Sequence, residues 1–321
     1  MTILITGSAG HLGEALMRTL QASGTPARGL DILPSPFTTD VGSICDPGFV
    51  RAAMAGVTAV IHAATLHKPH VATHSRHAFV DVNLTGTLTL LEAALAASVG
   101  AFVYTSTTSA FGSALSPATG EPAAWITEDV TPVPRNIYGV TKVAAESLCE
   151  LFHRDQGLPV VVLRTSRFFP EADDNTAVAV AYALENVQAN ELLYRRADIA
   201  DVVSAHLLAA RRAADIGFGR FIVSATTPFG WDELAELRAY APAVIRRIYP
   251  AVDALYAARG WTLFPSLDRV YVNDRARSAL GWAPKYDFQH VMGCLAAGED
   301  FRSDLARAVG SKGYHRDSPP P

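Results

Sequence analysis

Short apolar runs alternate with longer segments of helical periodicity over the first two thirds of the chain. Apolar runs rich in β-branched residues predict strands, whereas apolar residues that recur every three to four positions predict helices. Strand-like runs lie at 2–6, 27–32, 57–62, 101–106 and 159–164, and helix-like segments at 11–23, 47–55, 83–97 and 140–155. The alternation predicts an α/β fold with a parallel, doubly wound sheet of the Rossmann type.

The pattern changes near Phe168-Phe169-Pro170, where charged and polar residues replace the apolar runs. It returns with a helix-like segment that begins at Asp198 and with the strand-like Phe221-Ile222-Val223-Ser224. We therefore expect residues 1–167, with about 198–226, to form the sheet domain. Residues 168–197 and 227–310 would form a smaller C-terminal substrate-binding lobe. Residues 311–321 would form a tail whose Ser318-Pro319-Pro320-Pro321 end is frayed.

The composition narrows the classes of function. Of the 321 residues, 49% are hydrophobic and 18% are charged, with a net charge of −4, which leaves no basic surface for nucleic acid. The apolar N-terminal run lacks the basic flank and cleavage site of a signal peptide, and no segment approaches the roughly 20 apolar residues of a membrane span. We expect a cytoplasmic protein. Cys45, Cys149 and Cys294 are widely separated, which predicts buried thiols and not disulfides or metal ligands.

The first strand-like run leads at once into Gly7-Ser8-Ala9-Gly10-His11-Leu12-Gly13. Glycines at this spacing permit a tight turn, a close approach of the backbone to a pyrophosphate, and close packing of the helix that follows. The second run ends in Asp31, eighteen residues beyond Gly13, where a carboxylate accepts hydrogen bonds from an adenosine ribose. Ile32 follows with no adjacent arginine to neutralise a 2′-phosphate. NAD is therefore preferred over NADP, with Arg28 left open as a partner for that phosphate.

Tyr138 and Lys142 lie four residues apart in a helix-like segment, which puts them on one helix face. An ammonium beside a phenol favours the phenolate, and so lowers a pKa that is about 10 in isolation. The pair therefore predicts a base that takes a hydroxyl proton near neutral pH.

Together these motifs resemble the extended short-chain dehydrogenase/reductases, specifically the NAD-dependent epimerase/dehydratase family, from residue 1 to about residue 290. Further segments match that family in order, and the resemblance implies an NAD-dependent enzyme whose sheet domain binds the cofactor. These segments are Asp40-Val41, where the family contacts adenine; 60–64, similar to its fourth strand and cofactor-lining turn; 81–87, similar to its Asn-containing helix start; 102–112, similar to its next strand; and Leu280-Gly281-Trp282-Ala283-Pro284, similar to its C-terminal signature.

The resemblance also implies roles for individual residues. Thr107 would donate a hydrogen bond to the substrate oxygen, Tyr138 would exchange its proton, and Lys142 would hold the nicotinamide ribose. Asn83 would act indirectly, through backbone and water, although an asparagine at a helix start is as often a cap. The implied cofactor contacts are Gly7, Gly10, His11, Leu12, Gly13, Asp31, Ile32, Asp40, Val41, Ala63, Ala64, Thr65, Thr105, Tyr138, Lys142 and Thr165.

Two further expectations concern metals and assembly. His70 and His74 have metal-ligand spacing, but no carboxylate or thiol joins them at short spacing, so no metal is expected. Segments 83–97 and 140–155 are apolar around more of their circumference than one buried face requires. The resemblance implies that these helices pair across a homodimer interface, and a helix sandwiched within its own subunit is the alternative.

The resemblance leaves several reactions open. Family dehydratases carry an acidic pair after the catalytic threonine, where this chain has Thr108 and Ser109, so dehydration is disfavoured. Nucleotide-sugar 4-epimerases, which act on UDP-sugars, carry an asparagine where this chain has Arg167. Ser166 and Pro170-Glu171 are more similar to uronate dehydrogenases.

We therefore expect hydride transfer at a secondary alcohol or ketone of a carbohydrate, by an epimerase or a sugar-acid dehydrogenase. A non-catalytic NAD-binding sensor is the alternative from another class, and the presence of Thr107, Tyr138 and Lys142 argues for chemistry. Candidate substrate contacts are His67, Thr108, Ser109, Ser166 and Arg167.

Overall fold

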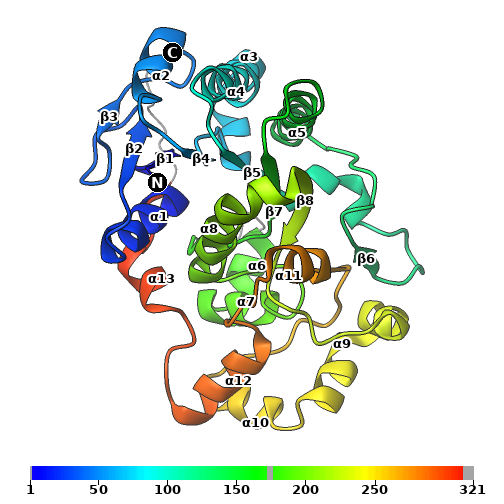
Figure 1. Ribbon diagram of the computed structural model, residues 1–321. Coiled ribbons are helices and arrows are strands. Elements are labelled where there is room, and N and C mark those ends of the chain that lie inside the picture. Colours follow the sequence, from blue (N-terminus) through cyan, green and yellow to red (C-terminus); the bar gives the residue numbers. More distant parts are fainter. Residues whose placement is uncertain (1, 172–175, 314–321) are drawn as a thin grey trace.

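In residues 2–171 and 176–313, which the computed structural model describes, seven parallel strands form the central sheet (Figure 1). Their order is β3-β2-β1-β4-β5-β7-β8, which reverses at β1 as in a doubly wound fold. The predicted fold class is confirmed, and the five predicted strands match to within two residues. The strands are β1 (Ile3–Thr6), β2 (Ala27–Asp31), β3 (Asp40–Val41), β4 (Ala59–His62), β5 (Ala101–Thr107), β7 (Val160–Thr165) and β8 (Phe218–Val223).

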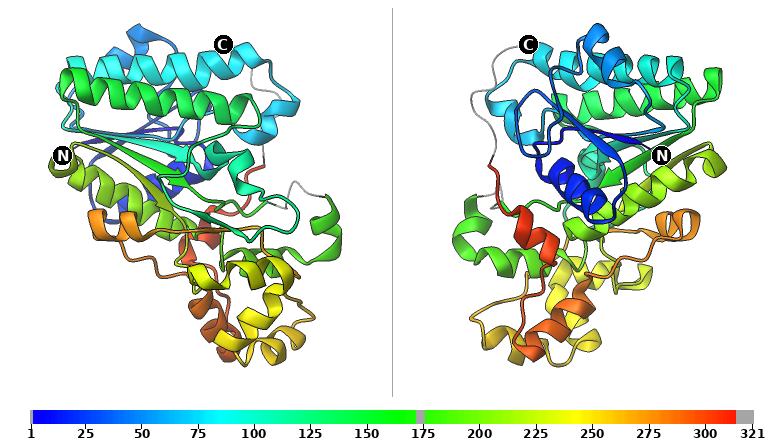
Figure 2. Two further views of the ribbon diagram at one scale, coloured as in Figure 1. Left: turned by 90° about the vertical axis from the view of Figure 1, so that its right-hand side faces the viewer. Right: turned by 60° about the vertical axis from the view of Figure 1, so that its left-hand side comes forward.

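Helices cover both faces of the sheet (Figure 2). On one face, Ile3 and Ile5 pack with residues of α1 (His11–Ala22) and α8 (Ile199–Ile216). On the other face, Leu4 packs with residues of α2 (Pro47–Ala53), α4 (Gly86–Ala96) and α5 (Ile137–Gln156). Because successive side chains of a strand point to opposite faces, burial on both sides requires the continuous apolar runs that the sequence has.

The helix that carries Asn83 begins earlier than predicted. Helical backbone runs from Arg76 to Ala96 through α3 (Arg76–Val80), a π-helical turn (Asp81–Thr85) and α4, so Asn83 lies inside the helix and is not its cap. At 21 residues and a hydropathy of 1.3, this helix is long and apolar enough to cross a membrane, contrary to the expectation that no segment is. Leu90 and Leu91 are fully buried against the sheet, so it is a core helix of this fold.

A second, mainly helical body extends from the carboxyl ends of the strands. It contains α6 (Thr176–Ala181), α7 (Leu184–Glu191), α9 (Leu234–Ile248), α10 (Val252–Ala257) and α12 (Phe288–Ala297), and has its own core around Leu237 and Phe288. A two-stranded parallel sheet, β6 (Ala124–Ile126) with β9 (Arg269–Tyr271), joins the loop after β5 to this body. Residues from the first half of the chain thus help to build the second body.

Two segments from the range predicted for the lobe pack on the sheet domain instead. α11 (Asp274–Leu280) and the following Trp282 lie in the same core as α1 and α8, and α13 (Asp304–Val309) contacts the same two helices. The Trp282 indole donates a 2.9 Å hydrogen bond to Ser204 on α8. The Leu-Gly-Trp signature therefore serves packing.

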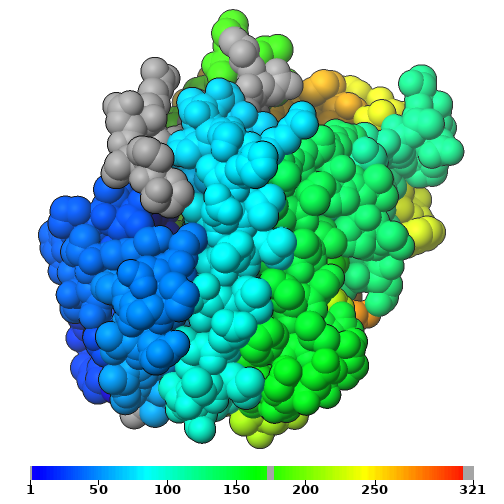
Figure 3. Space-filling model, turned by 90° about the horizontal axis from the view of Figure 1, so that it is seen from above, coloured from blue at the N-terminus to red at the C-terminus, as the bar shows by residue number. Residues whose placement is uncertain are grey.

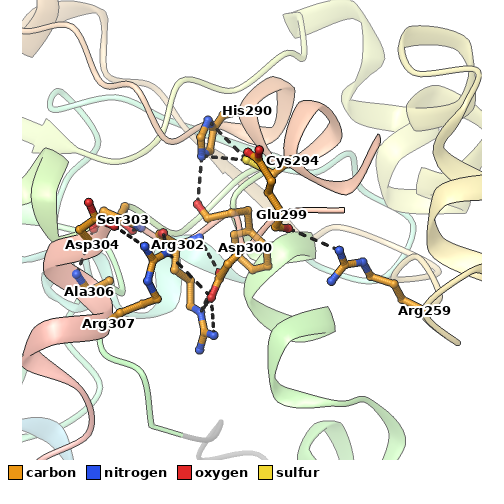
Figure 4. A network of polar contacts seen from close by, with 12 residues as sticks. Arg259, His290, Cys294, Glu299, Asp300, Arg302, Ser303, Asp304, Ala306 and Arg307 are labelled. Carbon is orange, nitrogen blue, oxygen red and sulfur yellow. Dashed lines mark hydrogen bonds and ion pairs between the residues drawn. The ribbon is translucent and has the colours of Figure 1, made fainter. Parts of the chain in front are cut away.

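A polar network fixes the connection between α12 and α13 (Figure 4). Asp300 binds Arg302, and His290 lies 3.0 Å from the carbonyl oxygen of Phe301. Cys294, next to His290, and Cys149 are buried free thiols, whereas Cys45 is only half-buried.

Beyond this network and α13, residues 311–313 lie at the start of α1. We call these residues the C-terminal strap. There Lys312 binds Glu14, and the main-chain N–H groups of Lys312 and Gly313 each donate a 3.1 Å hydrogen bond to Glu171. The strap belongs to the predicted tail, whose last eight residues, 314–321, lie outside the described residues.

Candidate active site

The glycine-rich turn between β1 and α1 has no room for side chains at two of its glycines. Gly7 adopts φ +75°, and a Cβ there would lie 2.7 Å from the amide nitrogen of Ala64. A Cβ at Gly13 would lie 1.9 Å from the carbonyl oxygen of Gly7. The turn therefore holds the N-terminus of α1 open toward the ends of the strands, where its N–H groups can face an anion.

The Asp31 carboxylate ends β2 beside this turn. It accepts hydrogen bonds from the main-chain N–H of Ala9, at 2.9 Å, and of Leu33, at 3.0 Å. Arg28, which the sequence left open as a partner for a 2′-phosphate, forms a 2.6 Å ion pair with Asp40 and donates to the carbonyl oxygen of Ala53. Its guanidinium is therefore occupied away from Asp31.

A cleft of about 260 Å³ runs from the glycine turn across the carboxyl ends of the strands. Its lining includes most of the predicted site residues. They are Gly7, Gly10, His11, Leu12, Gly13, Ala63, Thr65, His67, Thr105, Thr107, Thr108, Ser109, Tyr138, Lys142, Thr165, Ser166 and Arg167. The predicted residues outside this lining are Asp31, Ile32, Asp40, Val41, Ala64 and Asn83.

Thr107 and Tyr138 meet in the cleft from different elements. Thr107 is the last residue of β5, and Tyr138 lies in the first turn of α5, which Asn136 caps through a 3.0 Å bond from the Gly139 N–H. Burial raises the pKa of Tyr138 to about 12, and a hydrogen bond with the Thr107 side chain acts in the opposite direction. In the protein alone the phenol is therefore protonated at neutral pH.

Lys142 lies one turn further along α5 and is buried. Its Nζ donates a 2.8 Å hydrogen bond to the carbonyl oxygen of Thr105 and lies 4.7 Å from the centre of the Tyr104 ring. Desolvation lowers the pKa of Lys142 to about 7, while the charge of Glu146 raises it. Near neutral pH, Lys142 is therefore divided between its protonated and neutral forms.

Asn83 holds the loop beside the cleft against α5. Its amide oxygen accepts from Thr65 at 2.9 Å and from the Leu66 N–H at 2.8 Å, and its amide nitrogen donates to Thr141 at 3.2 Å. Thr141 precedes Lys142 on α5, so Asn83 connects the wall of the cleft to α5. No cap is involved, because the residue lies in the π-helical turn.

Aromatic and imidazole side chains form one wall. The His67 ring lies 6.3 Å from that of Tyr138 and 5.4 Å from that of Phe169, and desolvation lowers the pKa of His67 to about 3. The Nε2 atom of His11 lies 2.8 Å from Glu171. Burial raises the pKa of Glu171, but the His11 contact outweighs it and brings the value to about 2.

A group of arginines lines another wall of the cleft, and the sequence indicates only one of them, Arg167. Arg195 and Arg269 line the cleft with Arg167, and Leu115, Phe168 and Tyr271 are also part of its lining. Glu191, with 0% of its side chain exposed, lies behind them, 2.7 Å from Arg195 and 3.5 Å from Arg167. The side chain of Ser166 also lies here, and its hydroxyl is buried without a partner among the described residues.

These residues come from segments up to about a hundred positions apart, which is why periodicity does not find them. Arg195 and Arg196 follow α7, whereas Arg269 begins β9. Among the described residues, no three His, Cys, Asp or Glu side chains lie close enough together to hold a metal ion.

Known proteins resemble this chain at several levels. A family model described as the NAD dependent epimerase/dehydratase family matches residues 3–223. A UDP-glucose 4-epimerase of Azospirillum brasilense is 27% identical over 97% of this chain and 94% of its own length. A dTDP-glucose 4,6-dehydratase of Streptomyces niveus is 34% identical over 53% of this chain and 55% of that protein, so the chain spans about half the length of that relative.

A solved structure supports the fold. It is a short-chain dehydrogenase/reductase superfamily protein from Agrobacterium tumefaciens with bound NAD, which superposes with a TM-score of 0.66 at 24% identity over 92% of this chain and 96% of its own. The family match covers the glycine turn, Thr107, Tyr138 and Lys142 in one alignment. This protein therefore belongs to the NAD-dependent epimerase/dehydratase family.

Proposed function

We propose that the protein catalyses NAD-dependent hydride transfer at a secondary alcohol or ketone of a carbohydrate that carries an anionic group. The observation that carries this proposal is the meeting of Thr107, Tyr138 and Lys142 in one cleft that begins at a glycine turn and ends at arginines.

The described residues fit a dinucleotide. A Cβ at Gly7 or Gly13 would collide with the protein backbone, so only glycine permits so tight a turn. The cleft reaches the first residues of α1, whose N–H groups can face a pyrophosphate. Asp31 lies at the end of β2, where its carboxylate can accept from ribose hydroxyls. With Arg28 held by Asp40, a 2′-phosphate would meet only this acid, so NAD is the proposed cofactor over NADP.

The proposed chemistry divides between three side chains. Bound NAD would supply the hydride acceptor. Thr107 orients the substrate hydroxyl by a hydrogen bond, and Tyr138 Oη takes its proton. Lys142 would hold the nicotinamide ribose when NAD is bound. Burial raises the pKa of Tyr138 to about 12, and a cation beside the phenol would favour its phenolate.

The arginines of the far wall support an anionic substrate. Arg167, Arg195 and Arg269 all line the cleft, on the side away from the glycine turn. Glu191 and Asp268 bind them from behind and so hold the guanidinium groups in place. Arginine binds a carboxylate or phosphate through paired N–H groups, so a wall of this kind suits a sugar that carries either group.

Two forms of this reaction are candidates. Arg167, in place of the asparagine of nucleotide-sugar epimerases, favours oxidation of a sugar acid by a uronate-type dehydrogenase. The end-to-end match with a UDP-glucose 4-epimerase favours a UDP-sugar 4-epimerase.

The test is incubation of the purified protein with NAD and with separate panels of sugar acids and UDP-sugars, with Tyr138→Phe as the matched control. A rise in absorbance of reduced nicotinamide supports the dehydrogenase. Isomerised sugar without net reduction, with NAD that survives purification, supports the epimerase. Cofactor binding with no turnover on either panel supports the sensor and overturns the proposal.

We also propose a cytoplasmic homodimer that pairs through α4 and α5. These helices lie side by side at the surface in the view from above (Figure 3). Val140 on α5 is 50% exposed and Leu95 on α4 is 36% exposed, although Leu90 and Leu91 are buried within the subunit. Light scattering on wild type and Val140→Arg tests this, since the charged variant should be a monomer.

A further inference from the structure

Glu146 is a buried carboxylate that the proposed chemistry does not use. It lies on α5 one helical turn beyond Lys142, and 1% of its surface is exposed. Its oxygens accept a 2.5 Å hydrogen bond from Ser106 and a 2.7 Å hydrogen bond from Arg164. Buried carboxylates are rare unless they are paired, and burial of the pair still costs desolvation free energy. Packing alone does not explain why a carboxylate stands at this position.

The partners of Glu146 belong to the strand that carries the site and to its neighbour. Ser106 on β5 pairs in register with Arg164 on β7, so the carboxylate binds two adjacent strands at one point. Ser106 lies between Thr105, whose carbonyl oxygen accepts from Lys142, and Thr107. Three successive residues of β5 therefore contact α5: Thr105 contacts Lys142, Ser106 contacts Glu146 and Thr107 contacts Tyr138. These contacts fix the position of Tyr138 relative to Thr107.

Lys142 is buried, so the groups around it decide whether it keeps its charge. The carbonyl oxygen of Thr105 and the Tyr104 ring are its direct contacts. Glu146 is the carboxylate that raises the pKa of Lys142 against the desolvation that lowers it. The other titratable or charged groups that face Lys142 or Glu146 are Tyr138 and Cys149 on α5, Tyr104 on β5, His62 on β4, His67 in the loop after β4, Arg164 on β7 and Arg220 on β8.

We propose that Glu146 is a positioning residue for the reaction, which keeps Lys142 cationic and holds α5 in register with β5 through Ser106 and Arg164. It touches neither substrate nor cofactor and acts through Lys142. The inference rests on the proposed function only in taking Lys142 as the group that holds the cofactor.

The chain offers a direct measurement, because it contains four lysines, at positions 68, 142, 285 and 312. In protein labelled with ¹⁵N-lysine, the Nζ resonance of Lys142 can be assigned from its loss in Lys142→Arg and followed against pH. Glu146→Gln should lower the midpoint of this titration by at least about one pH unit, a tenfold change in the proton dissociation constant. Glu146→Asp, which keeps the charge, should recover most of the shift.

Glu150→Gln is the matched control. Glu150 lies one turn further on the same helix, is half exposed, and binds Arg220 at 2.5 Å. Its removal takes the same charge from α5 and should leave the Lys142 midpoint within about 0.3 units of wild type.

Two results would overturn the inference: a Lys142 midpoint that is unchanged in Glu146→Gln, or one that moves as far in Glu150→Gln. Should Glu146→Gln fail to fold because Arg164 is left unpaired, Glu146→Gln/Arg164→Met removes both charges. Loss of the Arg164 cation acts in the opposite direction on Lys142, so the fall in its midpoint should be smaller than in Glu146→Gln, but a fall must still be measured. The titration needs no turnover, so failure of the carbohydrate assay leaves it intact. With an active substrate, the rate of Glu146→Gln should fall at a lower pH than that of wild type.

Discussion

The ammonium of Lys142 donates a 2.8 Å hydrogen bond to the main-chain carbonyl oxygen of Thr105. This bond ties the helix that carries Tyr138 to the strand that ends in Thr107, two residues further on. A main-chain acceptor keeps its place whatever the side chains do, so the lysine is oriented before any ligand binds.

Replacing the phenol should remove the proton acceptor without disturbing the fold. Tyr138→Phe is expected to lower kcat/KM about 10²- to 10⁴-fold, the usual contribution of a positioned acid or base. NAD binding, measured by calorimetry, should stay within a few-fold of wild type. Tyr256→Phe, a buried tyrosine of the lobe, is the control and should keep full activity. Residual activity above a tenth of wild type in Tyr138→Phe would contradict its role.

Cofactor choice should depend on Asp31 and not on Arg28. Asp31→Ser removes the carboxylate that would accept hydrogen bonds from the ribose. We expect it to weaken NADH binding about 10- to 100-fold and to reduce the preference for NADH over NADPH. Fluorescence titration with both nucleotides measures this. Because Asp40 holds Arg28, Arg28→Leu should leave the NADPH affinity unchanged; a marked loss there would show that the arginine reaches the 2′-phosphate.

The glycine turn predicts a contrast between two alanine substitutions. Gly13→Ala puts a Cβ 1.9 Å from the carbonyl oxygen of Gly7, so the turn must open and NAD binding should be lost. Gly293 lies inside α12, and a Cβ added there would have nothing within 4 Å, so Gly293→Ala should raise the unfolding free energy by about 0.5–1 kcal/mol. Urea unfolding and NAD titration of both variants test the pair. Equal effects of the two substitutions on NAD binding would show that the collision at Gly13 does not determine cofactor binding.

Buried histidines predict a loss of stability in acid. Desolvation lowers the pKa of His62 to about 3 and of His206 to about 4, from 6.5. The unfolded chain therefore binds more protons below pH 6.5, and each histidine should cost about 1.4 kcal/mol per pH unit as the pH falls toward its folded value.

The comparison of wild type with His206→Gln isolates one of these histidines. Asp201, whose pKa burial raises to about 6, has the opposite effect between pH 3.8 and 6, but it cancels in that difference. Urea unfolding at pH 7, 6 and 5 should show a shallower loss in the variant. Parallel pH profiles would contradict the assignment.

Local patterns predict what depends on neighbours in sequence. The strands, the glycine turn, Asp31 and the Tyr138–Lys142 pair are each specified within a few residues, and the sheet brings them together at the carboxyl ends of parallel strands. The prediction for Asn83 is right in the element but wrong in the position along it, because a π-helical turn leaves no mark on apolar periodicity.

The arginine wall is predicted only in part, since Arg167 is among the candidate substrate contacts but Arg195 and Arg269 are not. Arg167, Arg195 and Arg269 meet because the second body folds back over the sheet, and no spacing records that contact. Glu146 is hidden for another reason: in sequence it is one more polar residue on a helix, and only the packing of α5 shows that it is buried.

The C-terminal strap and the start of α1 both bind the carboxylate of Glu171. Glu171 follows the strand that leads into the arginine wall, yet its Oε1 atom binds His11 at the start of α1 and the main-chain N–H groups of Lys312 and Gly313. A displacement of either segment must stretch or break the same few bonds. Glu171 thus connects the end of the cleft proposed for the dinucleotide with the end proposed for the sugar. If one ligand changes the affinity for the other, the second must change the affinity for the first by the same factor.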